Sequence, residues 1–208
     1  GELDGGQTFT YTLALTDGAA YSATNIDFVT NSIGTFKVDQ AGGGNGVGGY
    51  DDVTPTAWEE SWGAGLGAGM DFAKGVGSSV NVGWTLPEIA GSTIKLAYTP
   101  RQGGTVAADK ATGGDGGYKK AAYDIMLDLN TGQAMNLPNI FIGGSHSEVE
   151  SGPTSIAASD HEEVVVGFKY VIGPVTLGAQ TSGEFTGGKV AGDTEYYHNR
   201  GYGISFNV

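Results

Sequence analysis

Alternation of apolar and polar residues with a period of two is the feature that most limits the fold of this 208-residue chain. Successive side chains of a β-strand point to opposite faces, so this pattern predicts strands with one apolar face each. The run 123–129 is the most informative, because two aspartates alternate there with large apolar residues. Ten such segments occur, at residues 8–15, 23–29, 35–40, 80–84, 93–98, 123–129, 139–147, 164–171, 175–179 and 202–208.

The connections between these segments alternate between short and long. The short ones are residues 30–34, 86–91, 130–137 and 172–174, and the long ones are residues 41–78, 99–117, 148–161 and 184–194. An up-and-down barrel of an outer membrane has short turns at one end and long loops at the other. A β-sandwich has no reason to sort its connections in this way. We therefore predict one domain, residues 1–208, that is an all-β, antiparallel, up-and-down transmembrane β-barrel.

Composition limits the classes of function. The net charge of −13 argues against nucleic acid and anionic membrane surfaces as partners. The chain has no cysteine, which excludes disulfides, zinc–thiolate sites and thiol nucleophiles. No run approaches the roughly 20 apolar residues of a transmembrane helix, but this test does not detect barrel strands, whose lipid-facing residues alternate with others.

Residue types that carry catalysis or hold cofactors do not form a recognised motif here. His146, His161 and His198 are far apart in sequence and lack metal-ligand spacing. The glycine-rich run at residues 42–49 is not followed by the Lys-Ser/Thr pair of a phosphate-binding loop. No serine lies in a nucleophile motif. We therefore predict a protein that is not an enzyme and that has neither a cofactor nor a metal site.

The apolar faces of the predicted strands are expected to meet lipid, and the polar faces a water-filled lumen. Aromatic residues near strand ends, such as Trp84, Tyr98 and Tyr123, suit the interfacial belt of a membrane barrel. We expect the charged residues of the polar faces to line the lumen wall, either as charges that orient solutes or as partners in ion pairs. They are Asp27, Lys37, Asp39, Lys95, Asp124, Asp128 and Lys169.

The long connection at residues 42–66 combines a glycine run with four carboxylates and two tryptophans. These six residues are Asp51, Asp52, Glu59, Glu60, Trp58 and Trp62. Two tryptophans would leave a large apolar area in water if the loop hung outside, and the glycines allow the backbone to turn back into a lumen. We predict that the loop constricts the pore and that its carboxylates favour cations. A solvated loop and a Ca²⁺ site without EF-hand spacing are the alternatives.

Two short stretches resemble Gram-negative general porins. The run GELDGGQTFTYTLAL at residues 1–15 resembles a porin hairpin in which an acidic-Leu-x-x-Gly turn precedes a strand. The run NIDFVTNSIGTFKVDQ at residues 25–40 looks like the porin strand–turn–strand, with its turn at residues 33–36. In porins the next connection is the loop that folds into the pore. The composition is most similar to porins of marine alphaproteobacteria.

This resemblance implies a channel in the cell outer membrane for passive diffusion of small hydrophilic solutes and ions, in contact with outer-membrane lipid and assembled as a homotrimer. Porin barrels have about sixteen strands, so ten segments imply that both ends of a larger barrel are missing. The sequence departs from the family at Asp39 and Gln40, where porins place arginine, and at Val208, where they end in phenylalanine. A secreted or surface β-sandwich that uses the acidic loop for adhesion or Ca²⁺ binding is the alternative function.

Overall fold

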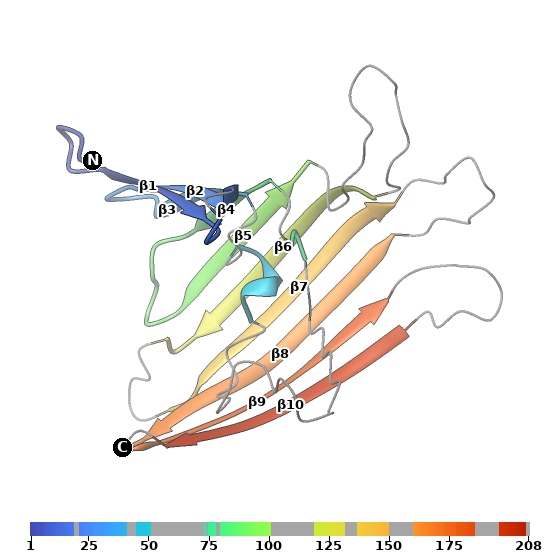
Figure 1. Ribbon diagram of the computed structural model, residues 1–208. Coiled ribbons are helices and arrows are strands. Elements are labelled where there is room, and N and C mark those ends of the chain that lie inside the picture. Colours follow the sequence, from blue (N-terminus) through green and yellow to red (C-terminus); the bar gives the residue numbers. More distant parts are fainter. Residues whose placement is uncertain are drawn as a thin grey trace, which may run out of the picture.

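The computed structural model of the protein describes residues 1–18, 21–40, 45–50, 73, 75–77, 80–100, 119–131, 137–149, 160–185 and 196–206. These residues form ten β-strands and one short 3₁₀-helix, η1 (Val47–Tyr50) (Figure 1). The strands are β1 (Thr8–Leu15), β2 (Tyr21–Val29), β3 (Thr35–Gln40), β4 (Asn81–Thr85), β5 (Thr93–Thr99), β6 (Lys119–Leu129), β7 (Asn139–Val149), β8 (His161–Ile172), β9 (Val175–Phe185) and β10 (Tyr196–Phe206). Within these ranges no helix has the length and apolar character needed to cross a membrane. Each predicted segment overlaps one strand, so the prediction of an all-β chain is confirmed.

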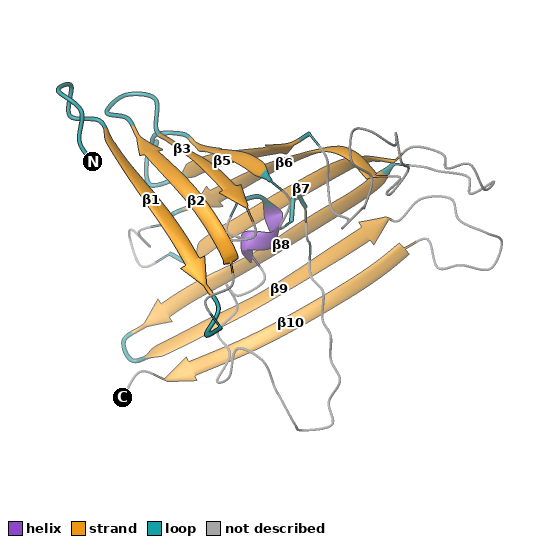
Figure 2. Ribbon diagram, turned by 45° about the horizontal axis from the view of Figure 1, so that its top comes forward, coloured by secondary structure: helices purple, strands orange, loops and turns teal. Residues whose placement is uncertain are grey.

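The ten strands belong to one sheet, in which each strand pairs antiparallel with its neighbours in sequence. The order from β1 to β10 is therefore up-and-down, as predicted. Strands β1 and β10 are the two edges, so the sheet is open in the part of the chain that the structure describes. Figure 2 shows that the sheet curves, with η1 on its concave side.

The four longest connections all leave the same end of the sheet. They follow β3, β5, β7 and β9, whereas those after β2, β4, β6 and β8 are shorter. Because neighbouring strands run in opposite directions, connections after odd-numbered and even-numbered strands lie at opposite ends. The shortest connection, between β8 and β9, contains Gly173 with a φ of +57°, a backbone conformation that glycine adopts easily. The predicted sorting of connections by length is confirmed.

The two faces of the sheet differ: one carries exposed large apolar side chains, and the other mixes buried polar side chains with a few buried apolar ones. The face that we call the outer face has exposed large apolar residues on every strand from β1 to β8, and Ile125 in the middle of β6 is 60% exposed. The inner face has buried polar residues, and Asp39 on β3 is 0% exposed. This arrangement agrees with the predicted faces. The exposed apolar residues of the outer face include Phe9, Tyr11, Ile26, Ile94, Ile125 and Phe168.

Buried apolar side chains gather on the inner face. One cluster joins Met126, Phe141 and Val165 of the sheet to residues of the β3–β4 connection, among them Val47 and Tyr50. A second, smaller cluster adds Val76 of the same connection, which packs with alanines of β5 and β6. The core described here therefore forms between one sheet and a chain segment packed against it, and a second sheet takes no part in it.

Candidate functional site

The candidate site is the inner face of the sheet together with the part of the β3–β4 connection that packs on it. We call residues 45–50, 73 and 75–77 of this connection the internal segment. The segment includes η1, which lies on the concave side of the sheet near β6, β7 and β8 (Figure 2). Its apolar side chains are buried in the two core clusters, so the segment packs against the inner face of the sheet.

Asp124 on β6 is the main hydrogen-bonding anchor of the internal segment. Its Oδ2 atom accepts hydrogen bonds from the backbone N–H of Val47, at 2.9 Å, and of Val76, at 3.0 Å. These donors lie 77 and 48 residues away in sequence, so one carboxylate joins both parts of the segment to the sheet. Hydrogen bonds to a charged group contribute roughly 1.5–3 kcal/mol each, which makes this carboxylate important for keeping the segment in place.

Two glycines allow the backbone to approach Asp124 this closely. Gly46 has a φ of +73° and Gly75 a φ of +51°, and both values disfavour residues with a side chain. A Cβ atom added at either position would collide with the Asp124 carboxylate. Gly46 belongs to the glycine run at residues 42–49, whereas Gly75 lies outside it. Each glycine directly precedes a valine, Val47 or Val76, whose backbone N–H must reach the buried carboxylate.

Asp128, two residues further along β6, binds the other end of η1. Its Oδ1 atom accepts a hydrogen bond from the Tyr50 hydroxyl at 2.8 Å, and its Oδ2 atom lies 2.6 Å from Lys95 Nζ on β5. The Tyr50 ring stacks on Phe141, with 4.7 Å between ring centres. Burial, together with the charge and hydrogen bond of Asp128, raises the pKa of Tyr50 well above its ordinary value. The phenol therefore stays neutral and remains a hydrogen-bond donor.

Further contacts tie the internal segment to strands on both sides of β6. Asn45 Nδ2 donates hydrogen bonds to Asn81 Oδ1 on β4, at 2.7 Å, and to the Lys37 carbonyl on β3, at 3.2 Å. Glu163 Oε2 on β8 accepts a hydrogen bond from the Gly75 N–H at 2.5 Å. Side chains of β4, β6 and β8 thus hold the segment across the width of the inner face.

The seven charged residues predicted for the polar faces all lie on the inner face, as the strand register shows. Asp27 stands opposite Lys37 in the register of β2 and β3, and Asp124 and Asp128 lie on the same face as Lys95. The prediction that some of these charges pair with one another is confirmed for Lys95 and Asp128. Lys169 stands opposite Asn139 at the far end of the face. Whether these residues line a channel stays a prediction.

The six residues predicted to form the constriction lie outside the described residues. They are Asp51, Asp52, Trp58, Glu59, Glu60 and Trp62. The described residues of the same connection, 45–50, 73 and 75–77, pack on the inner face. Whether the six predicted residues constrict a pore stays a prediction.

The sequence pattern did not predict roles for Tyr50, Asn45 or Glu163. The predicted connection at residues 148–161 also ends too late, because β8 begins at His161 and includes Glu163. The physical reason is that charged residues at the start of this strand resemble a polar loop, although they alternate with residues of the other face. Extending the alternation of β8 backward by three residues would have placed His161 and Glu163 together on the inner face.

No protein-family model and no curated protein matches this chain. The function that we propose therefore rests on the residues of the inner and outer faces. One group on the inner face also has ligands suited to a metal ion: His161, Glu163 and Glu184.

Proposed function

We propose that this protein is an outer-membrane porin: a transmembrane β-barrel with a water-filled channel through which small hydrophilic solutes and ions diffuse passively. Cations pass more easily than anions. The function has no chemical step, so the protein is not an enzyme. Its partners are its solutes, the lipid of the cell outer membrane and two further copies of itself in a homotrimer.

The single observation that carries the proposal is the reversed arrangement of the two faces. In a water-soluble β protein the large apolar residues are buried and the polar face meets water. Here Ile125, Tyr123 and Ile142 are exposed on the outer face, while Asp124 and Ser145 of the same two strands are buried on the inner face. A membrane barrel has this arrangement, because lipid surrounds its outer surface and its interior is polar.

Aromatic pairs on the outer face support the same conclusion. Tyr98 and Tyr123 lie at the end of the sheet with the long connections, with 5.1 Å between ring centres. Phe36 and Trp84 stack at the opposite end, with 5.5 Å between ring centres. Membrane barrels carry an aromatic belt at each interface, because amphipathic rings prefer the level of the lipid headgroups.

Strand lengths and sheet edges also bear on the proposal. Strands β6 to β10 have 11 or 12 residues, and a tilted strand needs about 9–11 residues to cross a bilayer. An open sheet edge cannot face hydrocarbon, because its backbone groups would lack hydrogen bonds. The proposal therefore requires that the backbone groups at the edges β1 and β10 find hydrogen-bond partners in the closed barrel.

The charges of the inner face support a preference for cations. Asp39, Asp124, Asp128 and Glu163 are buried carboxylates on this face, and Lys95 is paired with one of them. The net charge of the chain is −13. Carboxylates that line a narrow opening attract cations and repel anions. The predicted constriction residues would add four carboxylates to this wall.

The β-sandwich alternative needs two sheets that face each other across a core. The residues that the structure describes form one sheet, and their core lies between that sheet and the internal segment. No observation in this part of the chain favours the sandwich, so we propose the porin alone.

Planar-bilayer recordings of the full-length protein, refolded in detergent, test the proposal. We expect discrete conductance steps and, in a KCl gradient, a reversal potential displaced toward that of K⁺. The displacement should shrink as the salt concentration rises, because salt screens the carboxylates. Absence of conductance steps in protein that has refolded, as judged by its β-sheet circular dichroism, would refute the proposal.

The predicted constriction can be tested in the same assay. A variant in which the four acids become amides should prefer cations less than the wild type; it carries Asp51→Asn, Asp52→Asn, Glu59→Gln and Glu60→Gln. The control variant, Asp4→Asn with Glu88→Gln, removes exposed carboxylates next to short turns and should behave as the wild type. An unchanged reversal potential in the first variant would mean that these acids do not line the constriction.

A further inference from the structure

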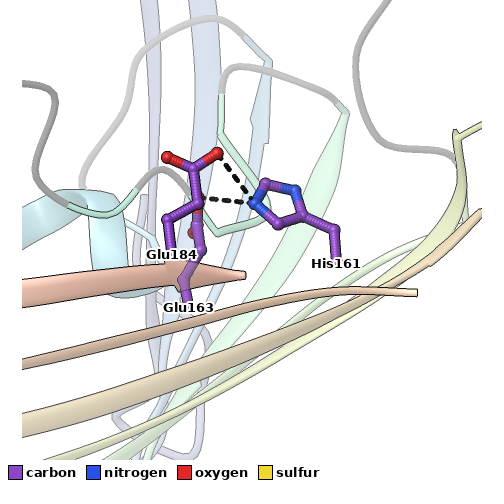
Figure 3. Close-up of side chains that lie close together, drawn as sticks. All are labelled: His161, Glu163 and Glu184. Atoms are coloured by element: carbon purple, nitrogen blue, oxygen red, sulfur yellow. Dashed lines mark ion pairs between the residues drawn. The ribbon is translucent and has the colours of Figure 1, made fainter. Parts of the chain in front are cut away.

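Three metal-ligating side chains meet on the inner face, where β8 begins and β9 ends. His161 and Glu163 are two residues apart on β8 and therefore point to the same face. Glu184 on β9 stands directly opposite Glu163 in the strand register. One ligand atom from each residue lies within 4.8 Å of the others. Figure 3 shows that the His161 ring points toward both carboxylates.

The distances between these atoms are close to those of a metal site. His161 Nε2 lies 2.9 Å from Glu184 Oε1 and 3.7 Å from Glu163 Oε1. In a tetrahedral site with bonds near 2.1 Å, ligand atoms are separated by roughly 3.4 Å. The two measured distances lie on either side of this value. Small side-chain rotations would be enough to receive an ion.

Burial of the group gives a reason for an ion to bind. The side chains of His161 and Glu163 are 10% and 3% exposed, and that of Glu184 is 25% exposed. Two carboxylates this close together repel each other, and their repulsion is strong where water is scarce. A divalent cation neutralises both charges, and the partly exposed side at Glu184 leaves room for water or another ligand to complete the coordination.

We propose that His161, Glu163 and Glu184 form a binding site for a divalent transition-metal ion, for which Zn²⁺ is the appropriate probe. An imidazole nitrogen with two carboxylate oxygens suits Zn²⁺ and its first-row neighbours. Ca²⁺ and Mg²⁺ prefer oxygen ligands alone and more of them. The competing explanation is that a proton on His161 makes an ion pair with the two glutamates and no metal binds.

The site is connected to the internal segment through Glu163. While Oε1 of this carboxylate faces His161, Oε2 accepts the hydrogen bond from the Gly75 N–H. A metal ion that holds the Glu163 side chain in place would therefore also hold its hydrogen bond to the internal segment in place. Binding of the ion does not depend on the proposed function. Only its consequence for conductance, a change in the opening when Zn²⁺ is added, rests on the porin proposal.

Isothermal titration calorimetry with ZnCl₂ tests the site. The full-length protein is refolded in detergent, freed of metal with EDTA and dialysed into a buffer that does not bind zinc. We expect saturable binding of one Zn²⁺ per chain that millimolar Mg²⁺ does not displace. His161→Ala should weaken this binding roughly tenfold or more, since even residues that only support metal ligands have effects of this size. Glu184→Gln, which keeps the shape of the side chain, should do the same.

His146 provides the matched control. It lies on the outer face with its side chain 44% exposed, near Asp160 and Glu162 at 3.8 and 3.7 Å. His146→Ala should bind Zn²⁺ as the wild type does. If His161→Ala does not refold, the affinity of Glu184→Gln for Zn²⁺ tests the proposal in its place. The proposal is overturned if the wild type shows no saturable binding, if Glu184→Gln binds as tightly as the wild type, or if His146→Ala alone abolishes binding. Zinc binding without conductance steps would uphold the site and refute the porin.

Discussion

Replacing Asp124 with alanine should release the internal segment while the sheet stays folded. The change removes the carboxylate that accepts hydrogen bonds from the N–H groups of Val47 and Val76. An unpaired buried donor costs roughly 1–3 kcal/mol. One carboxylate serves both donors, and the alanine variant no longer buries a charge. We therefore expect a combined loss of about 2–4 kcal/mol, below the sum of the two upper values.

Hydrogen–deuterium exchange read by mass spectrometry measures this loss where it occurs. Since about 1.4 kcal/mol corresponds to a factor of ten, backbone amides in peptides covering residues 45–50 and 75–77 should exchange roughly 30-fold to 700-fold faster in the variant. Peptides from β7 and β8 should keep their protection. In the porin that we propose, the same variant should also have a larger single-channel conductance, because the segment no longer narrows the opening.

Asp27→Ala is the matched control for this experiment. Asp27 is also an inner-face aspartate, but it lies on β2 opposite Lys37 and is half-buried. Its removal should leave exchange in the internal segment unchanged. Our reasoning fails if Asp124→Ala leaves the exchange of residues 45–50 as slow as in the wild type, or if Asp27→Ala accelerates it equally.

Three further predictions follow from single contacts. Gly75→Ala should speed exchange in the internal segment, because a Cβ meets the Asp124 carboxylate, whereas Gly91→Ala, which also has a positive φ but open space around it, should not; equal acceleration by both variants would contradict the role of this contact. Since burial and Asp128 raise the pKa of Tyr50, its phenol stays neutral as the pH rises through about 10, so Tyr50→Phe should leave the alkaline absorbance change at 295 nm as large as in the wild type; a smaller change would contradict the burial. Ile125→Arg should destabilise folding in lipid vesicles by roughly 2–4 kcal/mol if the outer face meets the bilayer centre, and a neutral result in a urea refolding titration would speak against lipid contact.

The strands and their two faces could be predicted from the sequence because the period of two is local. Each segment of alternating residues assigns its own faces, whatever it pairs with. The ends of strands depend less on this local pattern. The predicted start of β8, at residue 164, was wrong, because the strand begins at His161. His161 and Glu163 belong to the polar inner face, and polar residues near a strand end have the composition of a loop.

Alternation by itself did not decide which face is buried, since a water-soluble sheet and a membrane sheet share the same pattern. The curvature of the sheet and the internal segment packed on it decided this. They bury the face of Asp124 and leave the face of Ile125 exposed. The glycine run indicated a loop able to turn back, but its packing on the inner face is a property of the folded chain.

The sequence by itself determined which residues form strands and which side chains share a face, because both depend on neighbours a few positions apart. Only the tertiary structure decided which distant groups meet. Asp124 reaches Val47 and Val76 across 77 and 48 residues, and Glu184 reaches Glu163 through strand register. These contacts depend on the register of all the intervening strands, since a register shift of one residue would move each of these side chains to the opposite face.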